Sequence, residues 1–250
     1  MSKRMRLKAI ICEVFTLEIH HAASRSTNCV DVEPLSMGLH DLGASMRSHL
    51  QERVDASDQS GYDAILLGYA LYGRGTDGLR AGATPLVLPR AHDCIGVLMG
   101  SRGRHMAYFE NHPGVYYRSP GWIKYQQRGQ RLEPALLSAN HAIGERRSRE
   151  ELIAQYGEDN GNFLYQQFTA YRRTYSGLTY IWTGVGAEDG YRAEACAEAE
   201  REHWEFEEVT GTTRLLEQMV NGDWNKEDFL FVPPGAYVRA TLGDEIMAAE

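Results

Sequence analysis

Apolar residues form three continuous runs in the first hundred residues of the chain. The runs are Leu7–Cys12, the segment YDAILLGYA at 62–70 and the segment TPLVLP at 84–89. Helical spacing of apolar residues predicts helices at Glu13–Ala23, Ala44–Ala56 and Asp93–Met99. The proline and glycines of the segment VDVEPLSMGLHDLG, at 30–43, predict a loop. Continuous apolar strands that alternate with helices are typical of a parallel sheet covered on both faces.

The pattern changes near residue 102 and again near residue 177. The middle segment contains an aromatic, turn-rich stretch at 111–125 and two helical patterns, Arg146–Tyr156 and Asn162–Tyr175. Strands and helices then alternate again, in the order GLTYIWTG at 177–184, Tyr191–His203, EFEEVT at 205–210, Thr212–Asn221 and DFLFVPPG at 228–235. We expect an α/β fold with three parts. They are two doubly wound, Rossmann-like parallel-sheet lobes at 1–101 and 177–250, and a helical, aromatic-rich insert at 102–176.

Residues with reactive side chains follow all three apolar strands of the first lobe. Cys12 and Glu13 end the first strand, residues 69–78 follow the second, and PRAHDCIG at 89–96 follows the third. Ligands of doubly wound sheets collect outside the carboxyl ends of the strands. These three strand ends are therefore the candidate functional site.

Histidine and cysteine at these strand ends suggest a metal site. Thiolate and neutral imidazole are common ligands of zinc and iron, and a catalytic metal keeps three protein ligands and one open position. Cys12, His92 and Cys94 could form such a set. Cys94 also falls in the first turn of a predicted helix, where the helix dipole lowers the pKa of a thiol. The alternative, which stays open, is a pair of buried cysteines beside a hydrogen-bonded histidine.

Several nearby side chains could move a proton. Glu13 and Asp93 flank the proposed ligands, and His40 lies in the glycine-flanked segment SMGLHDLG. We expect Asp41, which precedes a predicted helix, to act mainly as the helix N-cap. Whether His40 serves as a base, a ligand or neither is left open.

The segment GRGTDG, at 73–78, matches the G-x-G-x-x-G pattern but not the context of a dinucleotide site. It follows the second strand, and too few residues separate it from the third for a crossover helix. We interpret it as a loop that approaches a polar substrate through its backbone, with a plain tight turn as an equal alternative. The substrate-binding residues would be Gly73, Arg74, Gly75 and Thr76, with Tyr72 beside them as a catalytic, substrate-orienting residue.

Composition and charge narrow the function classes. The chain has 250 residues and a formal net charge of -8, which argues against a nucleic-acid partner. No apolar run approaches the roughly 18 residues that a membrane span requires, and the charged first residues do not resemble a signal peptide. The four cysteines are scattered and form no disulfide framework. We therefore expect a cytoplasmic protein that has no membrane partner.

Six segments, quoted in chain order, together resemble a known family. They are IICEV, GLHD, DAILLGYALYGRGTDGL, PLVLPRAHDCI, YYRSPGW and DFLFVPPG. The combination is similar to the uncharacterised prokaryotic family catalogued as domain of unknown function 1638, whose members are often discussed beside corrinoid-dependent methyltransfer systems. In typical members of the family, three strand-end cysteines fall at the positions of Cys12, Tyr72 and Cys94 in this chain. The resemblance implies that such cysteines could hold an iron–sulfur cluster or a metal. This chain has tyrosine at 72 and arginine at 74, where the family has cysteine and asparagine, so a cluster is less expected than a single ion.

The leading functional hypothesis is a zinc- or iron-dependent enzyme, a transferase or lyase, that acts on a small polar molecule. Methyl or other one-carbon group transfer fits the resemblance. One alternative is a non-catalytic protein that binds a metal, a corrinoid or a small ligand. Another is a metal-free enzyme with Cys94 as nucleophile and His92 or His40 as base. A corrinoid protein, a methyltransferase and a second copy of the chain are left open as partners.

Overall fold

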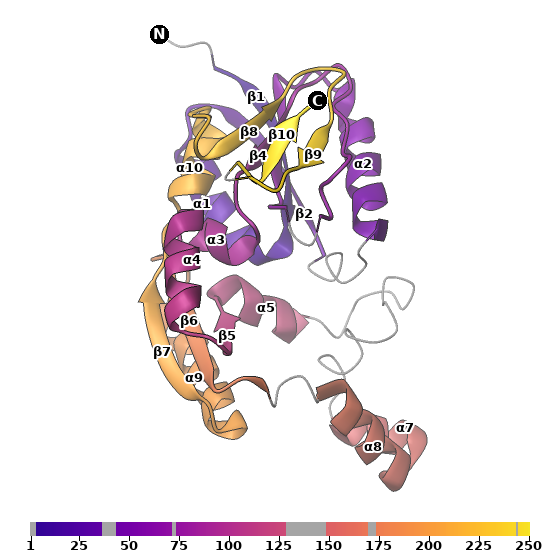
Figure 1. Cartoon of the computed structure of the whole chain (residues 1–250), viewed down its shortest axis with the longest axis vertical. Coiled ribbons are helices and arrows are strands. Elements are labelled where there is room, and N and C mark those ends of the chain that lie inside the picture. The colour runs from indigo at the N-terminus through magenta and orange to yellow at the C-terminus, as the bar shows by residue number, and fades with distance from the viewer. Residues whose placement is uncertain (1–3, 37–43, 72–73, 129–148, 170–173, 244) are drawn as a thin grey trace.

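The structure is a mixed α/β fold with parallel sheets (Figure 1). The computed structural model describes residues 4–36, 44–71, 74–128, 149–169, 174–243 and 245–250. A five-stranded sheet and a three-stranded sheet lie one beyond the other along the long axis of the molecule (Figure 1). In the described part of the chain, no helix is long and apolar enough to cross a membrane.

The larger sheet contains the three apolar runs of the first hundred residues. Its strand order is β2 (Cys29–Leu35), β1 (Arg6–Cys12), β3 (Ala64–Gly68), β4 (Leu86–Pro89) and β8 (Phe229–Val232). The first four strands are parallel, and β8 runs antiparallel to β4. Every residue of β3 and β4 is buried, as expected for central strands covered on both faces.

Helices cover both faces of this sheet. A 3-10 turn, η1 (Glu13–Phe15), leads from β1 into α1 (Thr16–Arg25), which packs beside α10 (Arg214–Asn221). Helix α2 (Ala44–Asp58) lies on the opposite side (Figure 1). The helices predicted between the strands are thus confirmed, and the short α3 (Cys94–Leu98) follows β4.

The prediction that residues 30–43 form only a loop was wrong. Cys29–Leu35 is the edge strand β2, which pairs in parallel with β1 from Cys29 beside Arg6 to Leu35 beside Cys12. Its mostly half-exposed residues lack the apolar run of a central strand. An edge strand tolerates Pro34, because one of its sides needs no backbone donor.

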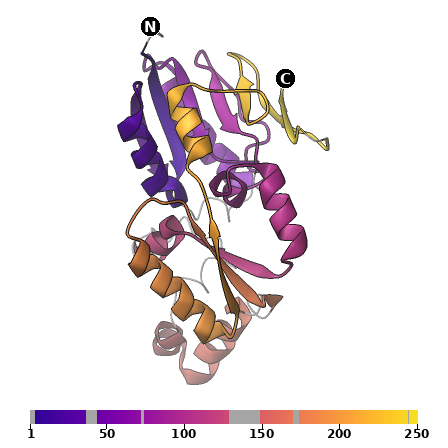
Figure 2. The same cartoon turned by 90° about the vertical axis from the view of Figure 1, so that its left-hand side faces the viewer.

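The smaller sheet has the order β5 (Val115–Arg118), β6 (Gly177–Trp182) and β7 (Glu205–Thr210), all parallel. Helices α5 (Pro120–Arg128) and α9 (Glu188–Glu202) pack together, and a separate core of Ile123, Leu178 and Trp204 joins them to this sheet. Helix α4 (Arg102–Asn111) leads from the larger sheet to β5 (Figure 2). It contacts the smaller sheet through a 2.8 Å hydrogen bond between the hydroxyls of Tyr108 and Thr179.

The expected boundaries at 101/102 and 176/177 do not separate the two sheets. Strand β5, inside the expected helical insert, belongs to the smaller sheet, whereas β8, expected in the C-terminal lobe, belongs to the larger one. The chain enters the smaller sheet after α3 and returns through α10. Strand order depends on pairing between residues far apart in the sequence. The alternation of strands and helices along the sequence therefore did not reveal that β5 and β8 belong to these sheets.

The remaining elements lie outside these layers. The antiparallel pair β9 (Val238–Ala240) and β10 (Met247–Ala249) is anchored by Arg90, which donates to the carbonyls of Phe229, Glu245 and Met247. Helices α7 (Arg149–Tyr156) and α8 (Glu158–Thr169) pack on each other and project from the body (Figure 1).

Candidate functional site

The three strand ends singled out in the sequence lie on one edge of the larger sheet. Strand β3 stands between β1 and β4, so the chain segments after Cys12, Gly68 and Pro89 leave the sheet side by side. The connection after β1 leads towards β2, and the connection after β3 leads towards β4. This reversal makes the β1/β3 edge the topological switch point, where doubly wound sheets bind ligands.

Cys12 ends β1 with its side chain in the core, and the residue is 7% exposed. Burial raises the pKa of its thiol to about 12, while a hydrogen bond from the backbone of Val14 opposes the rise and the charge of Glu13 adds to it. The Cys12 thiol is therefore protonated at neutral pH.

Cys94 is the first residue of α3. Part of the residue is exposed, but its thiol is enclosed by protein, and burial raises the thiol pKa well above its usual value. The charges of Asp93 and Cys12 raise it further, whereas the nearby indole N–H of Trp122 lowers it. The lowered pKa expected from the helix start was wrong, because desolvation outweighs the dipole of a five-residue helix.

Tyr69 completes the buried surroundings of the two thiols. Its hydroxyl donates to the Ile11 carbonyl at 3.5 Å. Burial, followed by the charges of Cys12 and Glu13, raises its pKa well above the usual value. Cys12 is thus coupled electrostatically to Glu13, Tyr69 and Cys94.

Asp93 connects this site to the smaller sheet. Its Oδ1 accepts a 3.0 Å hydrogen bond from the Gly96 amide and lies 3.5 Å from Nδ1 of His105 on α4. Burial and the charge of Asp93 raise the pKa of Tyr117, on β5, to about 12. Within the described part of the chain, the Tyr117 hydroxyl and His105 Nδ1 are buried without a hydrogen-bond partner. The sequence did not identify either residue, because both come from elements of the other sheet.

Helix α5 covers the thiols from the side of the smaller sheet. Its Trp122 contacts Cys94, and its Gly121 lies directly against η1. A Cβ atom at Gly121 would stand 1.9 Å from the Val14 carbonyl oxygen. Only glycine lets the two backbones approach this closely.

Gly121→Ala should therefore destabilise the protein. The methyl group cannot be accommodated by a side-chain movement, since the contact is with backbone, and overpacking of this kind lowers the free energy of unfolding by about 1–3 kcal/mol. Chemical denaturation of wild type and variant measures the loss. Gly190→Ala is the matched control, because a Cβ there meets nothing within 4 Å. Equal stability of all three proteins would contradict the close packing of α5.

The structure describes only part of the predicted ligand and substrate-binding set. His92 is half-buried. Among the described residues, which include Cys12, His92 and Cys94, no three His, Cys, Asp or Glu side chains gather closely enough to hold a metal ion. The structure therefore does not bring the three predicted ligands together, and a metal held by them stays a prediction. His40, Asp41, Tyr72 and Gly73 lie outside the described residues.

The rest of the glycine loop forms an internally bonded turn. Arg74, 68% exposed at its side chain, pairs with Asp77 at 2.7 Å. Thr76 is buried and donates to the Ala70 carbonyl at 3.3 Å, and Gly75 is also buried. These contacts favour the tight-turn interpretation, and the substrate-binding role of Arg74, Gly75 and Thr76 stays untested.

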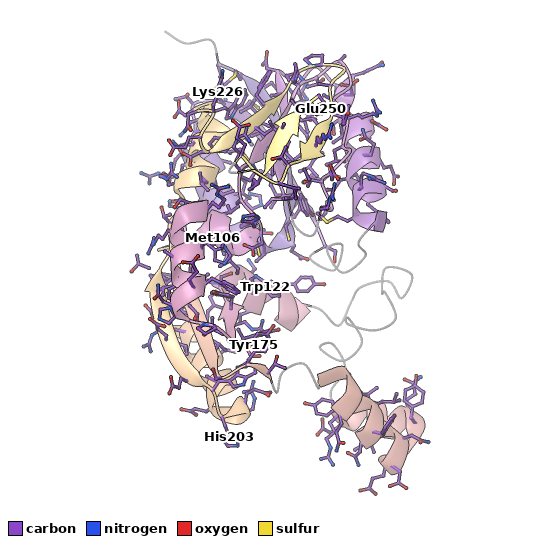
Figure 3. The ribbon with its side chains drawn as sticks, in the orientation of Figure 1. Met106, Trp122, Tyr175, His203, Lys226 and Glu250 are labelled. Atoms are coloured by element: carbon purple, nitrogen blue, oxygen red, sulfur yellow. The ribbon has the colours of Figure 1, made fainter. Side chains whose placement is uncertain are left out.

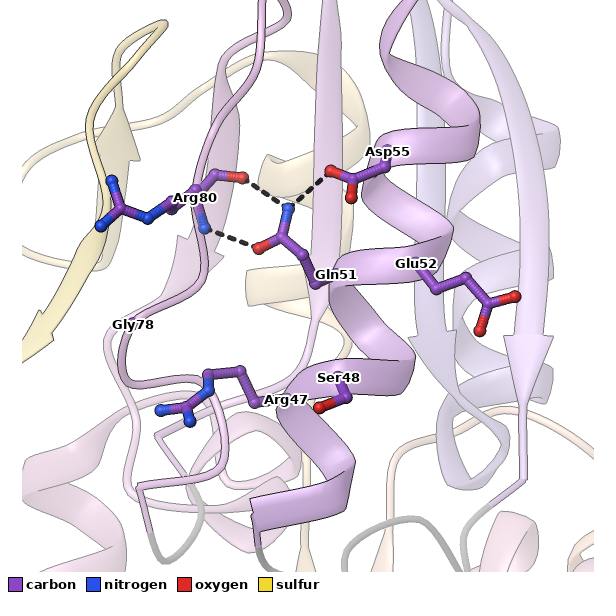
Figure 4. Close-up of a pocket in the computed structure, with 7 residues that line it drawn as sticks. All are labelled: Arg47, Ser48, Gln51, Glu52, Asp55, Gly78 and Arg80. Carbon is purple, nitrogen blue, oxygen red and sulfur yellow. Dashed lines mark hydrogen bonds between the residues drawn. The ribbon is translucent and has the colours of Figure 1, made fainter.

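A surface hollow lies apart from the thiols, between α2 and the strand-like segment at 78–80 (Figure 4). Seven residues line it: Arg47, Ser48, Gln51, Glu52, Asp55, Gly78 and Arg80. The Gln51 side chain bonds to both the backbone N–H and the carbonyl of Arg80, and also to Asp55. Gln51, Asp55 and the backbone of Arg80 thus already bond to one another, and these hydrogen bonds join α2 to the segment at 78–80.

Comparison with known proteins assigns a family but no activity. The family model described as "Protein of unknown function (DUF1638)" matches residues 34–220, three-quarters of the chain, and the match includes Cys94 but not Cys12. No curated protein and no solved structure matches the chain. The chain belongs to this family of proteins of unknown function, as its sequence segments indicated.

Proposed function

We propose that the protein is a zinc- or iron-dependent enzyme that acts on a small polar molecule between two Rossmann-like lobes, each built on one of the two sheets. One observation carries the proposal. Cys12 and Cys94 both lie at the ends of strands beside the switch point of the larger sheet, near enough that a charge on Cys12 would raise the pKa of Cys94. The carboxyl ends of parallel strands are the usual place for a catalytic site in such folds.

The protonation state of the two thiols favours a metal over a free nucleophile. The thiolate is the reactive form of cysteine, and burial keeps both thiols protonated at neutral pH. A zinc or iron ion would replace the two protons and compensate the charge of the thiolates. A metal-free nucleophile, with His92 or His40 as base, would lack this compensation and is the second candidate.

The other predicted residues would complete the site. We propose that metal binding would draw His92 to the two thiols as the third ligand, since the three do not gather in the described structure. Glu13, His40, Asp93 and Tyr72 would exchange protons with the substrate or orient it. The ion would polarise the substrate or activate a thiol or water. Transfer of a methyl or other one-carbon group is the reaction that the family resemblance favours. A cytoplasmic location would keep the four free cysteines reduced.

Elemental analysis tests the metal site. Protein purified without oxygen or chelator should contain about one zinc or iron per chain, and Cys12→Ser and Cys94→Ser should both lose it, because a serine hydroxyl stays protonated at neutral pH and binds these ions weakly. Cys29→Ser, at an exposed cysteine, is the matched control and should keep the metal.

If the wild-type protein contains no metal, the metal-dependent enzyme is excluded, and the metal-free enzyme with a cysteine nucleophile is the candidate that is left. Metal that survives in Cys94→Ser would show that the ion binds elsewhere. Metal lost from both variants, but no turnover of any small polar molecule by the loaded wild type, would favour the non-catalytic binding protein.

A further inference from the structure

Glu18, on the first turn of α1, is a carboxylic acid buried where the two sheets meet. Its residue exposure is 0%, the lowest of any acidic residue in the described chain. Its Oε1 accepts a 2.9 Å hydrogen bond from the hydroxyl of Thr183, which follows β6 of the smaller sheet. Its Oε2 is buried and has no hydrogen-bond partner among the described residues. The carboxyl group therefore joins the two halves of the molecule while one of its two oxygens has no partner among the described residues.

Only one described charge acts on this carboxyl group. Lys124 reaches it from α5, whereas Thr183 and the backbone of Glu18 contribute uncharged hydrogen bonds. These three favour the ionised form, but burial opposes it more strongly and raises the pKa of Glu18 to about 7. A buried carboxylate with an unpartnered oxygen gains solvation when its surroundings open.

The helix that faces Glu18 is also the helix that covers the thiols. Lys124 of α5 acts on Glu18, Trp122 of the same helix contacts Cys94, and Gly121 lies against η1. Figure 3 shows Trp122 on α5, below the larger sheet. Displacement of α5 from α1 would therefore uncover Cys94 as well as Glu18.

We propose that Glu18 is a proton-operated latch for the thiol site: the protonated carboxyl group keeps α5 docked on the larger sheet, and the ionised group releases it. The latch would regulate access to the site whose function is proposed above. The latch rests on the proposed function only in that the site it covers is taken to be the functional one. The movement of α5 itself requires neither metal nor substrate.

Hydrogen exchange of the α5 amides measures the latch directly. If the opened form returns Glu18 to its ordinary pKa of 4.5, the population of that form should rise about thirtyfold between pH 5.5 and 8 and level off above that. The readout is the exchange rate, corrected for its intrinsic pH dependence, in wild type relative to Glu18→Gln. The amide of this variant keeps the acceptor for Thr183 but does not titrate.

Labelling of Cys94 by a dipyridyl disulfide, which reacts with thiols even in weak acid, should follow the same curve. The exposed Cys29 is the internal control in each sample and should show no difference between wild type and Glu18→Gln. Thr183→Val removes a hydrogen bond that favours the ionised form, so its opening should continue to rise at higher pH than in wild type.

Identical corrected rates for wild type and Glu18→Gln at every pH would overturn the latch. If Glu18→Gln does not fold, an unchanged pH profile in Thr183→Val would overturn it instead. Elemental analysis of the same samples separates the two proposals. If the protein contains no metal but α5 still opens as the pH rises, the latch is supported and the metal-dependent enzyme is excluded. If the protein contains metal but α5 does not open with pH, only the metal-dependent enzyme is supported.

Discussion

Replacement of Glu198 by glutamine should lower the free energy of unfolding by about 3–5 kcal/mol, the largest effect on stability that we expect from a single side chain. Arg118, at the end of β5, is 1% exposed and donates two hydrogen bonds to the Glu198 carboxylate on α9, at 2.7 and 2.9 Å. The substitution removes the carboxylate that neutralises the buried guanidinium through two hydrogen bonds. Since a guanidinium cannot lose its proton at accessible pH, its desolvation is not relieved by neutralisation.

Denaturant unfolding of three variants distinguishes this ion pair from the mere loss of a surface charge. Glu200→Gln, at an exposed position of the same helix, should change stability by less than about 0.5 kcal/mol. The double variant Arg118→Met with Glu198→Leu removes both charges together and should lie much closer to wild type than Glu198→Gln. A Glu198→Gln protein as stable as the Glu200→Gln control would show that the pair is not buried in solution.

The elements that the sequence predicted well are those whose burial is complete. The runs at β1, β3 and β4 are apolar at nearly every position, because helices cover both faces of these strands. Strand β2 was missed because an edge strand shows no such run and admits a proline. The apolar residues of β8 predicted a strand but not its partner, since pairing depends on residues far away in the sequence.

The candidate site was predictable to the same extent. A parallel sheet places the ends of its strands on one edge, so Cys12 and Cys94 could be assigned to a common site before the strand order was known. Trp122, His105 and Tyr117 could not be assigned to it, because they reach the site from α5, α4 and β5. The raised thiol pKa values follow from this cover, and so the sequence, which shows only the helix start, indicated the opposite direction for Cys94.

The wild-type protein should become less stable as the pH rises from 5 to 8, and Glu18→Gln should largely abolish this loss. Folding raises the pKa of Glu18 from 4.5 to about 7, so the folded protein holds a proton that the unfolded chain releases within this interval. The unfavourable effect of Glu18 on the free energy of unfolding is absent below pH 4.5, grows up to pH 7 and is constant above it, where it reaches about 3 kcal/mol.

Denaturant unfolding at several pH values should therefore show a difference between wild type and Glu18→Gln that changes by about 2.5 kcal/mol from pH 5 to pH 8. Glu52→Gln, at an exposed carboxyl group, should run parallel to wild type. Parallel curves for wild type and Glu18→Gln would mean that Glu18 ionises without penalty in the folded protein, and both its burial and the latch would then be wrong.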